Sequence, residues 1–146
     1  RPRPAGSTTA PAEAGAEIRG GNETILLVED EPAVRLMTRR VLESKGYTIW
    51  EAASAREALE VWQSHAPEIA LLLTDIMMPE QMTGRDLAEQ LWRQRPGLKV
   101  VFMSGYSSEV LGKDTEFVRR TRSHFVQKPC SSRTLLETVR GCLDEK

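Results

Sequence analysis

Short apolar runs alternate along this chain with longer segments in which apolar residues recur every three or four positions. A continuous apolar run is typical of a strand buried on both faces, and the longer spacing is typical of a helix with one buried face. The pattern predicts strands over residues 25–28, 47–51, 69–74, 99–103 and 124–127. Because strands and helices alternate, we expect an α/β fold: a doubly wound, five-stranded parallel sheet with helices on both faces.

The segments between the strands carry signals for the beginning and end of helices. Pro32 suits the first position of a first helix, and Gly46 suits its end. Ser54 is the expected N-cap of a second helix, which Pro67 terminates. Further helices are expected around Leu87–Trp92, within residues 107–123, and after a serine cap at Ser131 or Ser132.

Residues 1–22 differ in composition from the rest of the chain. Twelve of them are Pro, Ala or Gly, and Ile18 is their only large aliphatic residue. Such a stretch buries too little apolar surface to offset the entropy cost of ordering it. We therefore expect a flexible linker over residues 1–22, one folded domain over residues 23–146, and a longer parent chain that includes both.

Charge and cysteine content narrow the classes of function. The 146-residue chain has a formal net charge of −1, which gives no general attraction to nucleic acid or to an anionic membrane. Its apolar runs are far shorter than the roughly 20 residues that span a bilayer. Cys130 and Cys142 lack the spacing of a metal site or a disulfide framework. We expect a cytoplasmic domain that contacts neither nucleic acid nor a membrane.

Polar residues of complementary kinds stand where four of the predicted strands end. Glu29-Asp30-Glu31, Asp75, Ser104 and Lys128 each follow an apolar run. In an open parallel sheet, ligands bind at the carboxyl ends of the strands, where these residues would meet. Carboxylates can hold Mg²⁺, the ammonium and the hydroxyl can contact phosphoryl oxygens, and the Asp75 carboxylate is a candidate nucleophile. Taken singly, each residue also fits a helix cap, a turn or a loop.

Four segments together resemble the receiver domain of bacterial two-component response regulators. They are Ile25–Pro32, Leu73–Pro79, Phe102–Tyr106 and Phe125–Pro129, within a resemblance that covers about residues 23–144. The resemblance implies the flavodoxin-like (βα)5 fold with strand order 2-1-3-4-5. It also implies Mg²⁺-dependent transfer of a phosphoryl group from the phosphohistidine of a sensor kinase to an aspartate.

The resemblance also assigns roles to single residues. It implies that Asp75 is the phosphoacceptor, and that Glu29, Asp30, Asp75 and the backbone carbonyl of Met77 surround the metal. Lys128 and Ser104 match the family positions that contact the phosphoryl group. An isolated domain of this kind phosphorylates and dephosphorylates only itself.

A switching role is implied for Ser104 and Phe125. Phosphorylation would draw the Ser104 hydroxyl inward, and Phe125 would rotate into the vacated space. Binding by the face built from residues 107–143 would then change, as a local electrostatic event biases an element with two arrangements.

The linker suggests the setting of the domain. A receiver that follows such a segment resembles the C-terminal receiver of a hybrid sensor histidine kinase, with the kinase and a histidine phosphotransfer protein as the expected partners. A stand-alone single-domain regulator is the alternative. A phosphohydrolase with an aspartate nucleophile is disfavoured, because such enzymes typically carry a second aspartate where this chain has Met77. A receiver-like module that no longer accepts phosphate is disfavoured by the complete set of polar residues.

Overall fold

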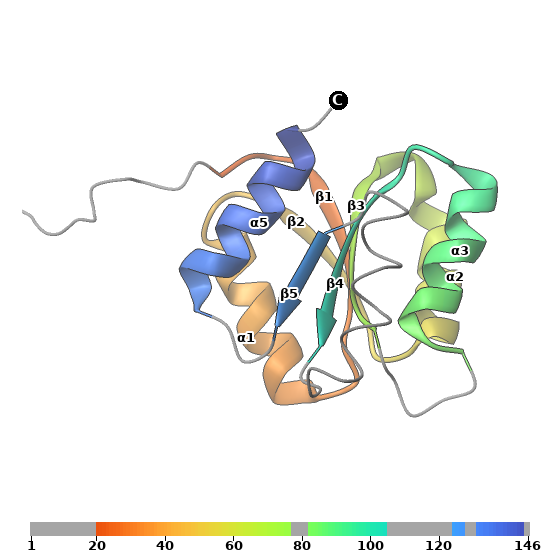
Figure 1. Cartoon of the computed structure of the whole chain (residues 1–146), viewed down its shortest axis with the longest axis horizontal. Helices are drawn as coiled ribbons and strands as arrows, with labels where there is room; N and C mark the ends of the chain where they lie inside the picture. Colours follow the sequence, from red (N-terminus) through yellow and green to blue (C-terminus); the bar gives the residue numbers. More distant parts are fainter. Residues whose placement is uncertain (1–19, 77–81, 105–123, 128–130, 145–146) are drawn as a thin grey trace, which may run out of the picture.

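The computed structural model describes residues 20–76, 82–104, 124–127 and 131–144. Strands and helices alternate through these residues, as the sequence predicts (Figure 1). The elements are β1 (Thr24–Val28), α1 (Pro32–Glu43), β2 (Thr48–Ala52), α2 (Ala55–His65), the 3-10 turn η2 (Ala66–Glu68), β3 (Ile69–Asp75), α3 (Gly84–Gln94), β4 (Lys99–Ser104), β5 (His124–Gln127) and α5 (Ser132–Asp144).

The five strands form one parallel sheet in the order β2-β1-β3-β4-β5, which confirms the predicted fold class. Strands β1 and β3 therefore lie side by side near the middle of the sheet, with Val28 opposite Thr74. Strand β4 lies on the other side of β3, with Met103 opposite Asp75. This order brings the ends of β1, β3 and β4 to one edge of the sheet.

Alternate residues of each strand enter two separate hydrophobic cores. On one face, Leu26, Leu72 and Phe102 pack with α2 and α3, and on the other Leu27, Leu73 and Val101 pack with α1 and α5. Figure 1 shows this arrangement, with α1 and α5 on one side of the sheet and α2 and α3 on the other. Burial on both faces explains why the strands read as continuous apolar runs in the sequence.

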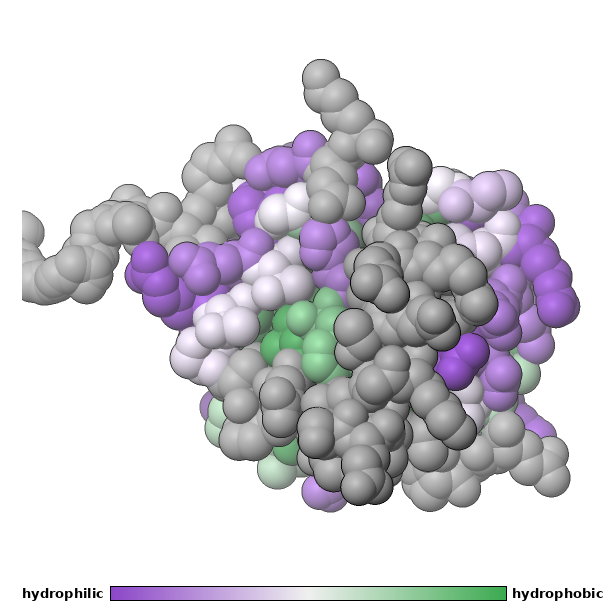
Figure 2. Space-filling model, viewed as in Figure 1, coloured by the Kyte–Doolittle hydropathy of each residue, from purple (hydrophilic) through white to green (hydrophobic). Residues whose placement is uncertain are grey.

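The visible outer surfaces of two helices are hydrophilic, whereas α1 exposes Leu36 and Met37. In the space-filling view, polar residues cover the visible surfaces of α5 and α3, and apolar residues reach the surface beside β5 (Figure 2). No helix within the described ranges combines the length and apolar character needed to cross a membrane.

Capping hydrogen bonds fix the starts of α2, α3 and α5, and the caps of α2 and α5 were predicted. Ser54 Oγ accepts a hydrogen bond from the Glu57 N–H at 3.2 Å, as predicted for the second helix. The Thr134 N–H donates to Ser131 Oγ at 3.1 Å, so Ser131 is the serine that caps α5. Helix α3 begins with a capping box between Thr83 and Asp86, which shields backbone N–H groups that have no partner within the helix.

The predicted boundaries differ from the observed ones in a few places. The second strand covers Thr48–Ala52 rather than residues 47–51, since its pairing with β1 begins at Thr48, and Tyr47 before it is buried in the core that α1 and α5 cover. Strands β3 and β4 each extend one residue further than predicted, to Asp75 and Ser104. The helix predicted within residues 107–123 lies outside the described residues.

One arginine joins the chain before β1 to the last helix. Arg140 on α5 donates to both carboxylate oxygens of Glu23, at 2.8 and 3.3 Å, and to the Gly20 carbonyl at 3.0 Å. It also contacts the Tyr47 hydroxyl at 3.3 Å and pairs with Asp144 at 2.9 Å. We call these contacts the Arg140 clamp.

The turn between α1 and β2 supplies the other side of the clamp. The Gly21 N–H donates to the Lys45 carbonyl at 3.0 Å. Gly46 has a φ of +99°, and a Cβ there would lie 2.5 Å from the Gly21 carbonyl oxygen. Glycine is therefore required at this position both for its backbone conformation and for the close approach of the incoming chain.

The clamp predicts a pH-dependent contribution to stability. Hydrogen bonds from Arg140 lower the pKa of the Glu23 carboxyl below its ordinary value of 4.5. The unfolded chain therefore binds this proton more readily, so the ion pair stabilises the fold above that value and is lost as the pH falls through the folded-state pKa. Glu23→Gln should lower the free energy of unfolding at neutral pH by about 1 kcal/mol, measured by urea denaturation.

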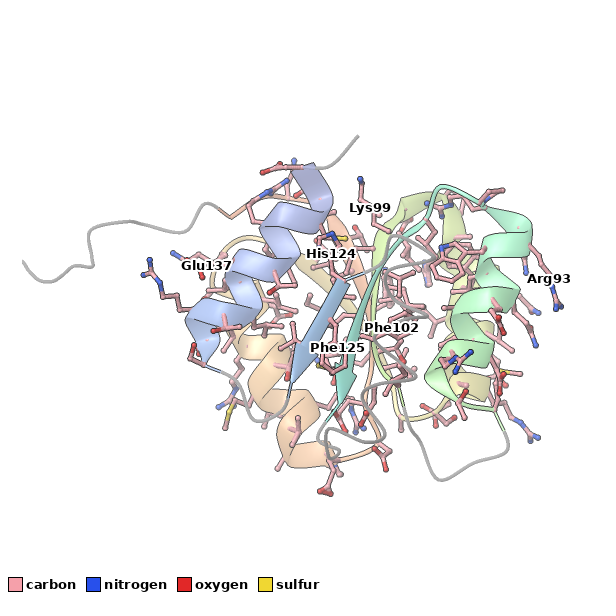
Figure 3. The ribbon with its side chains drawn as sticks, in the orientation of Figure 1. Arg93, Lys99, Phe102, His124, Phe125 and Glu137 are labelled. Atoms are coloured by element: carbon pink, nitrogen blue, oxygen red, sulfur yellow. The ribbon has the colours of Figure 1, made fainter. Side chains whose placement is uncertain are left out.

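Glu137→Gln is the matched control for this prediction. Glu137 also pairs with an arginine, Arg133, but both side chains are about half exposed and Glu137 points away from the body of the protein (Figure 3). Its replacement should change stability by less than about 0.5 kcal/mol. The difference between Glu23→Gln and wild type should also shrink below pH 4.5, and a difference that persists in acid would contradict the assignment.

Candidate functional site

Three carboxyl groups gather at the carboxyl-terminal edge of the sheet. Oxygens of Glu29, Asp30 and Asp75 all lie within 4.8 Å of one another. Glu29 is fully buried and Asp75 is 5% exposed. Converging carboxylate oxygens are the ligands that hard divalent cations prefer, so this group is a candidate cation site.

The turn from β1 into α1 positions Glu29 and Asp30. The Glu29 N–H donates to the Ala52 carbonyl at 3.1 Å, which extends the pairing of β1 with β2 by one residue. The Glu29 carboxylate accepts the Glu31 N–H at 3.1 Å. Glu31 is the N-cap residue of α1 but makes no side-chain capping hydrogen bond. The Glu31 side chain therefore does not cap α1, although the sequence allowed that role.

Asp75 occupies the end of the most enclosed strand. Strand β3 pairs with β1 on one side and β4 on the other, so its carboxyl end is held from both directions. Beyond Asp75, the Ile76 N–H donates to the Met103 carbonyl at 2.8 Å and the Gly84 N–H donates to the Ile76 carbonyl at 3.0 Å. These bonds fix the backbone on which the carboxylate stands.

The spacing of the three carboxyl groups suits a small, hard cation. Mg²⁺ prefers six oxygens at roughly 2.1 Å, so oxygens on opposite sides of the ion are about 4.2 Å apart. The observed upper limit of 4.8 Å is slightly wider. A small inward movement, or a coordinated water held by one carboxylate, would close the difference. The donor set therefore fits Mg²⁺ in chemistry, and its oxygens lie close to the spacing that the ion needs.

The other residues predicted for the site lie on neighbouring strand ends or outside the described residues. Ser104 is the last residue of β4, one position beyond the partner of Asp75. Phe125 lies opposite the buried Phe102 in the pairing of β5 with β4 and is itself partly buried (Figure 3). Met77 and Lys128 lie outside the described residues.

Two residues of this region were not singled out from the sequence. Gly84, the first residue of α3, lies so close to β3 that a Cβ would be 2.1 Å from the Asp75 carbonyl oxygen. Arg35, one turn into α1, donates to the Glu29 carbonyl at 2.7 Å. The Thr83-Gly84 pair, which precedes an apolar helical stripe, was a signal that could have pointed to Gly84. No pattern in the sequence distinguishes Arg35 from the other arginines of α1.

The fold and the acidic group at the edge of its sheet point to one class of protein, and comparison with known families identifies that class. The family model described as the response regulator receiver domain matches residues 25–140. The chain belongs to this family, and it is a receiver domain of two-component signalling.

Individual relatives include both kinase-borne and separate receivers. The chain is 38% identical to the sensor kinase CckA of Brucella abortus over 126 residues, which are 86% of this chain but 13% of CckA. It is 33% identical to the response regulator receiver protein CpdR of the same organism, covering 82% of this chain and 95% of CpdR.

A solved structure supports the same assignment. The crystal structure of the receiver domain from the hybrid histidine kinase CckA matches with a TM-score of 0.69 at 35% identity, covering 83% of this chain and 99% of that domain. The match thus spans nearly all of that solved receiver domain but only 13% of the length of the sensor kinase CckA.

The contact between Gly84 and Asp75 leads to a stability prediction. Gly84→Ala places a methyl group against a backbone carbonyl that cannot move away without disturbing β3. The free energy of unfolding should fall by about 2 to 3 kcal/mol, measured by urea denaturation.

Gly141→Ala provides the control, because it is the same substitution in a helix with open space around it. That change should raise stability by up to about 1 kcal/mol, since alanine favours the helix. Equal effects of the two substitutions would show that the approach of α3 to Asp75 does not require glycine.

Proposed function

We propose that this domain accepts a phosphoryl group on Asp75 from the phosphohistidine of a sensor histidine kinase. The main support is the group of three carboxyls at the carboxyl edge of the sheet, with Asp75 on the central strand. A nucleophile must be held in place while an anionic group approaches it, and Asp75 is nearly buried and backed by pairing on both sides of β3.

The acidic residues would divide the work at this site. Asp30 and Asp75 offer carboxylate oxygens for Mg²⁺, Glu29 offers one to the ion or to its coordinated water, and the Met77 carbonyl is the proposed further ligand. Bound Mg²⁺ would neutralise the charge that otherwise opposes the meeting of a carboxylate with a phosphoryl group. Lys128 and Ser104 are the proposed contacts of the phosphoryl oxygens.

The reaction itself is a displacement at phosphorus. An oxygen of Asp75 forms a bond to phosphorus as the bond between phosphorus and the donor imidazole nitrogen breaks. The donor leaves as a neutral histidine after it gains a proton, and the product is an acyl phosphate. Positioning and charge neutralisation supply most of the catalysis in such transfers. A sheet edge that holds the carboxylates in place therefore suits this reaction.

Membership of the receiver family favours this function over an aspartate-nucleophile phosphohydrolase. The likeness to CckA, together with the Pro/Ala/Gly-rich residues 1–22, supports a place in a hybrid histidine kinase in the cytoplasm. The parallel likeness to CpdR supports the alternative of a separate regulator. Sequencing the coding region upstream of Arg1 tests these two settings directly, since a kinase domain there would identify the first.

Replacement of Asp75 tests the central proposal. With Mg²⁺ and a small phosphodonor such as acetyl phosphate, intact-mass measurement should show one phosphoryl adduct on the wild-type protein and none on Asp75→Asn. The asparagine amide cannot attack phosphorus as a carboxylate does.

Asp86→Asn is a control for loss of a nearby carboxylate, because Asp86 is exposed and belongs to the α3 capping box. It should retain the adduct, and chelation of Mg²⁺ should abolish the adduct in both proteins. An adduct on Asp75→Asn, or one that forms equally in a chelator, would contradict the proposal.

Phosphorylation at this site would also act on β5, the strand beyond β4, through Ser104 and Phe125. Ser104 ends the strand that lies between Asp75 and β5, and Phe125 packs on the core that contains Phe102. We propose that a Ser104 contact with the phosphoryl group releases Phe125 to change position. This would alter the face formed by residues 107–143.

Ser104→Ala should therefore separate phosphorylation from its consequence. The variant should form the phosphoryl adduct to within a few-fold of wild type. The phosphorylation-dependent change in amide hydrogen exchange over residues 124–144 should be at least halved. Ser44→Ala, at an exposed helix end, should keep both properties. A full exchange response in Ser104→Ala would disprove the switching role.

A further inference from the structure

The backbone of Glu29 is held at both ends of the residue. Its N–H donates to the Ala52 carbonyl at 3.1 Å, and its carbonyl accepts a hydrogen bond from Arg35 Nη1 at 2.7 Å. The first bond continues the β1–β2 ladder, but the second comes from a side chain one turn into α1. The residue at the beginning of the acidic turn is therefore fixed by a guanidinium as well as by the sheet.

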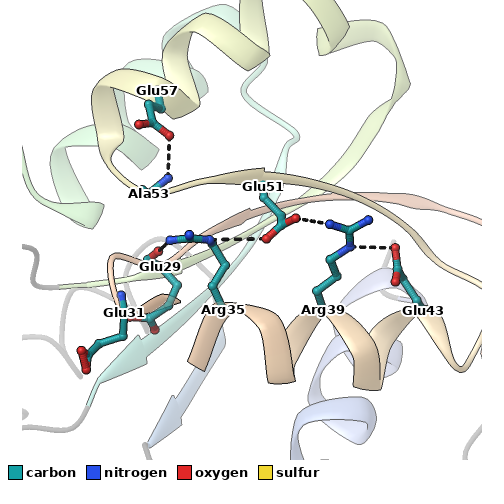
Figure 4. A network of polar contacts seen from close by, with 8 residues as sticks. All are labelled: Glu29, Glu31, Arg35, Arg39, Glu43, Glu51, Ala53 and Glu57. Carbon is teal, nitrogen blue, oxygen red and sulfur yellow. Dashed lines mark hydrogen bonds and ion pairs between the residues drawn. The ribbon is translucent and has the colours of Figure 1, made fainter. Parts of the chain in front are cut away.

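Arg35 is in turn oriented by β2. Its Nε lies 3.4 Å from an oxygen of Glu51, and the other Glu51 oxygen pairs with Arg39. Arg39 also pairs with Glu43 at 2.9 Å, so the ion pairs form a row along α1 (Figure 4). Only Arg35 of this row reaches the acidic turn. It is 21% exposed, so its side chain is more restricted than that of Arg39, which is 41% exposed.

Arg35 carries a positive charge, so it cannot favour the binding of a cation through charge alone. A guanidinium on the backbone carbonyl of Glu29 should repel Mg²⁺ at this site and weaken its binding by Coulomb interaction. Its removal should strengthen binding if charge alone mattered. Its hydrogen bond to the Glu29 carbonyl has the opposite effect, because residues behind metal ligands orient them and typically raise affinity.

We propose that Arg35 is a positioning residue for the phosphoryl-transfer site, which holds the turn carrying Glu29 and Asp30 in the geometry that binds Mg²⁺. It acts through the Glu29 carbonyl and touches neither the metal nor the phosphoryl group. Glu51 on β2 keeps the Arg35 guanidinium aimed at that carbonyl. This inference rests on the proposed function, since it concerns the same metal site.

The test compares Arg35→Met with Arg39→Met. Methionine keeps much of the aliphatic stem of arginine and removes the charge and the donors. Both variants lose one positive charge from α1 and one partner of Glu51, but only the first loses the bond to Glu29. Titration calorimetry with MgCl2 should give a dissociation constant about tenfold higher for Arg35→Met and within about twofold of wild type for Arg39→Met.

A kinetic measurement separates positioning from loss of folded protein. With acetyl phosphate as donor, the Mg²⁺ concentration for half-maximal phosphorylation of Arg35→Met should rise about tenfold. At saturating Mg²⁺ its rate should return to within about twofold of wild type, because the ion then restores the turn. A general loss of structure would lower the rate at every Mg²⁺ concentration.

Several results would overturn the assignment of Arg35. These are an unchanged or stronger Mg²⁺ affinity in Arg35→Met, an equal weakening in Arg39→Met, or a rate that saturating Mg²⁺ does not restore. If urea denaturation shows that Arg35→Met does not fold, Arg35→Lys replaces it under the same criteria, since one ammonium cannot reproduce the two-sided contact. Failure of the wild-type protein to bind Mg²⁺ would instead overturn the proposed function.

Discussion

Repulsion among Glu29, Asp30 and Asp75 is the constraint on which the rest of the structure depends. Two like unit charges 4 Å apart repel by about 4 kcal/mol near a protein surface. Flexible side chains on a mobile backbone would move apart. The rest of the fold must therefore hold these oxygens within 4.8 Å of one another.

The sheet supplies this restraint because the three residues stand on two interior strands or directly after them. Strands β1 and β3 each have a neighbour on both sides and a hydrophobic core on both faces. Asp75 is paired with Met103 of β4, and Thr74, the residue before it, is paired with Val28 of β1. The helices act at the same edge: α3 approaches Asp75 through Gly84, and α1 reaches Glu29 through Arg35.

Much of the fold could be predicted from the sequence because each strand is buried on both faces. Runs such as Ile69–Thr74 have few alternatives to a central parallel strand, and the residues that follow them must share an edge. The acidic group follows from that topology alone. Ser54 and the serine before α5 were recognisable as caps because capping depends on local spacing.

Arg35 and Gly84, which support the site, could not be predicted, because their roles depend on packing between elements and not on local spacing. Arg35 reaches back to Glu29 only because α1 leaves the sheet at a particular angle, and Glu51 meets it from a strand that is separate in sequence. Gly84 matters through its distance from the Asp75 carbonyl rather than through its own turn. Both contacts depend on how elements pack, which hydrophobic periodicity does not specify.

The two ends of β1 are connected to different parts of the protein, and the Arg140 clamp holds the amino end. Residues 20–23 are fastened at the amino end of the strand, beside the last turns of α5, and the carboxyl groups stand beyond its other end, roughly 16 Å away. The polypeptide that leads into the domain and a donor that approaches Asp75 therefore meet opposite ends of one stiff strand. Because Arg140 belongs to α5, a displacement of that helix would pull on the incoming chain directly, along a route that bypasses the carboxylates.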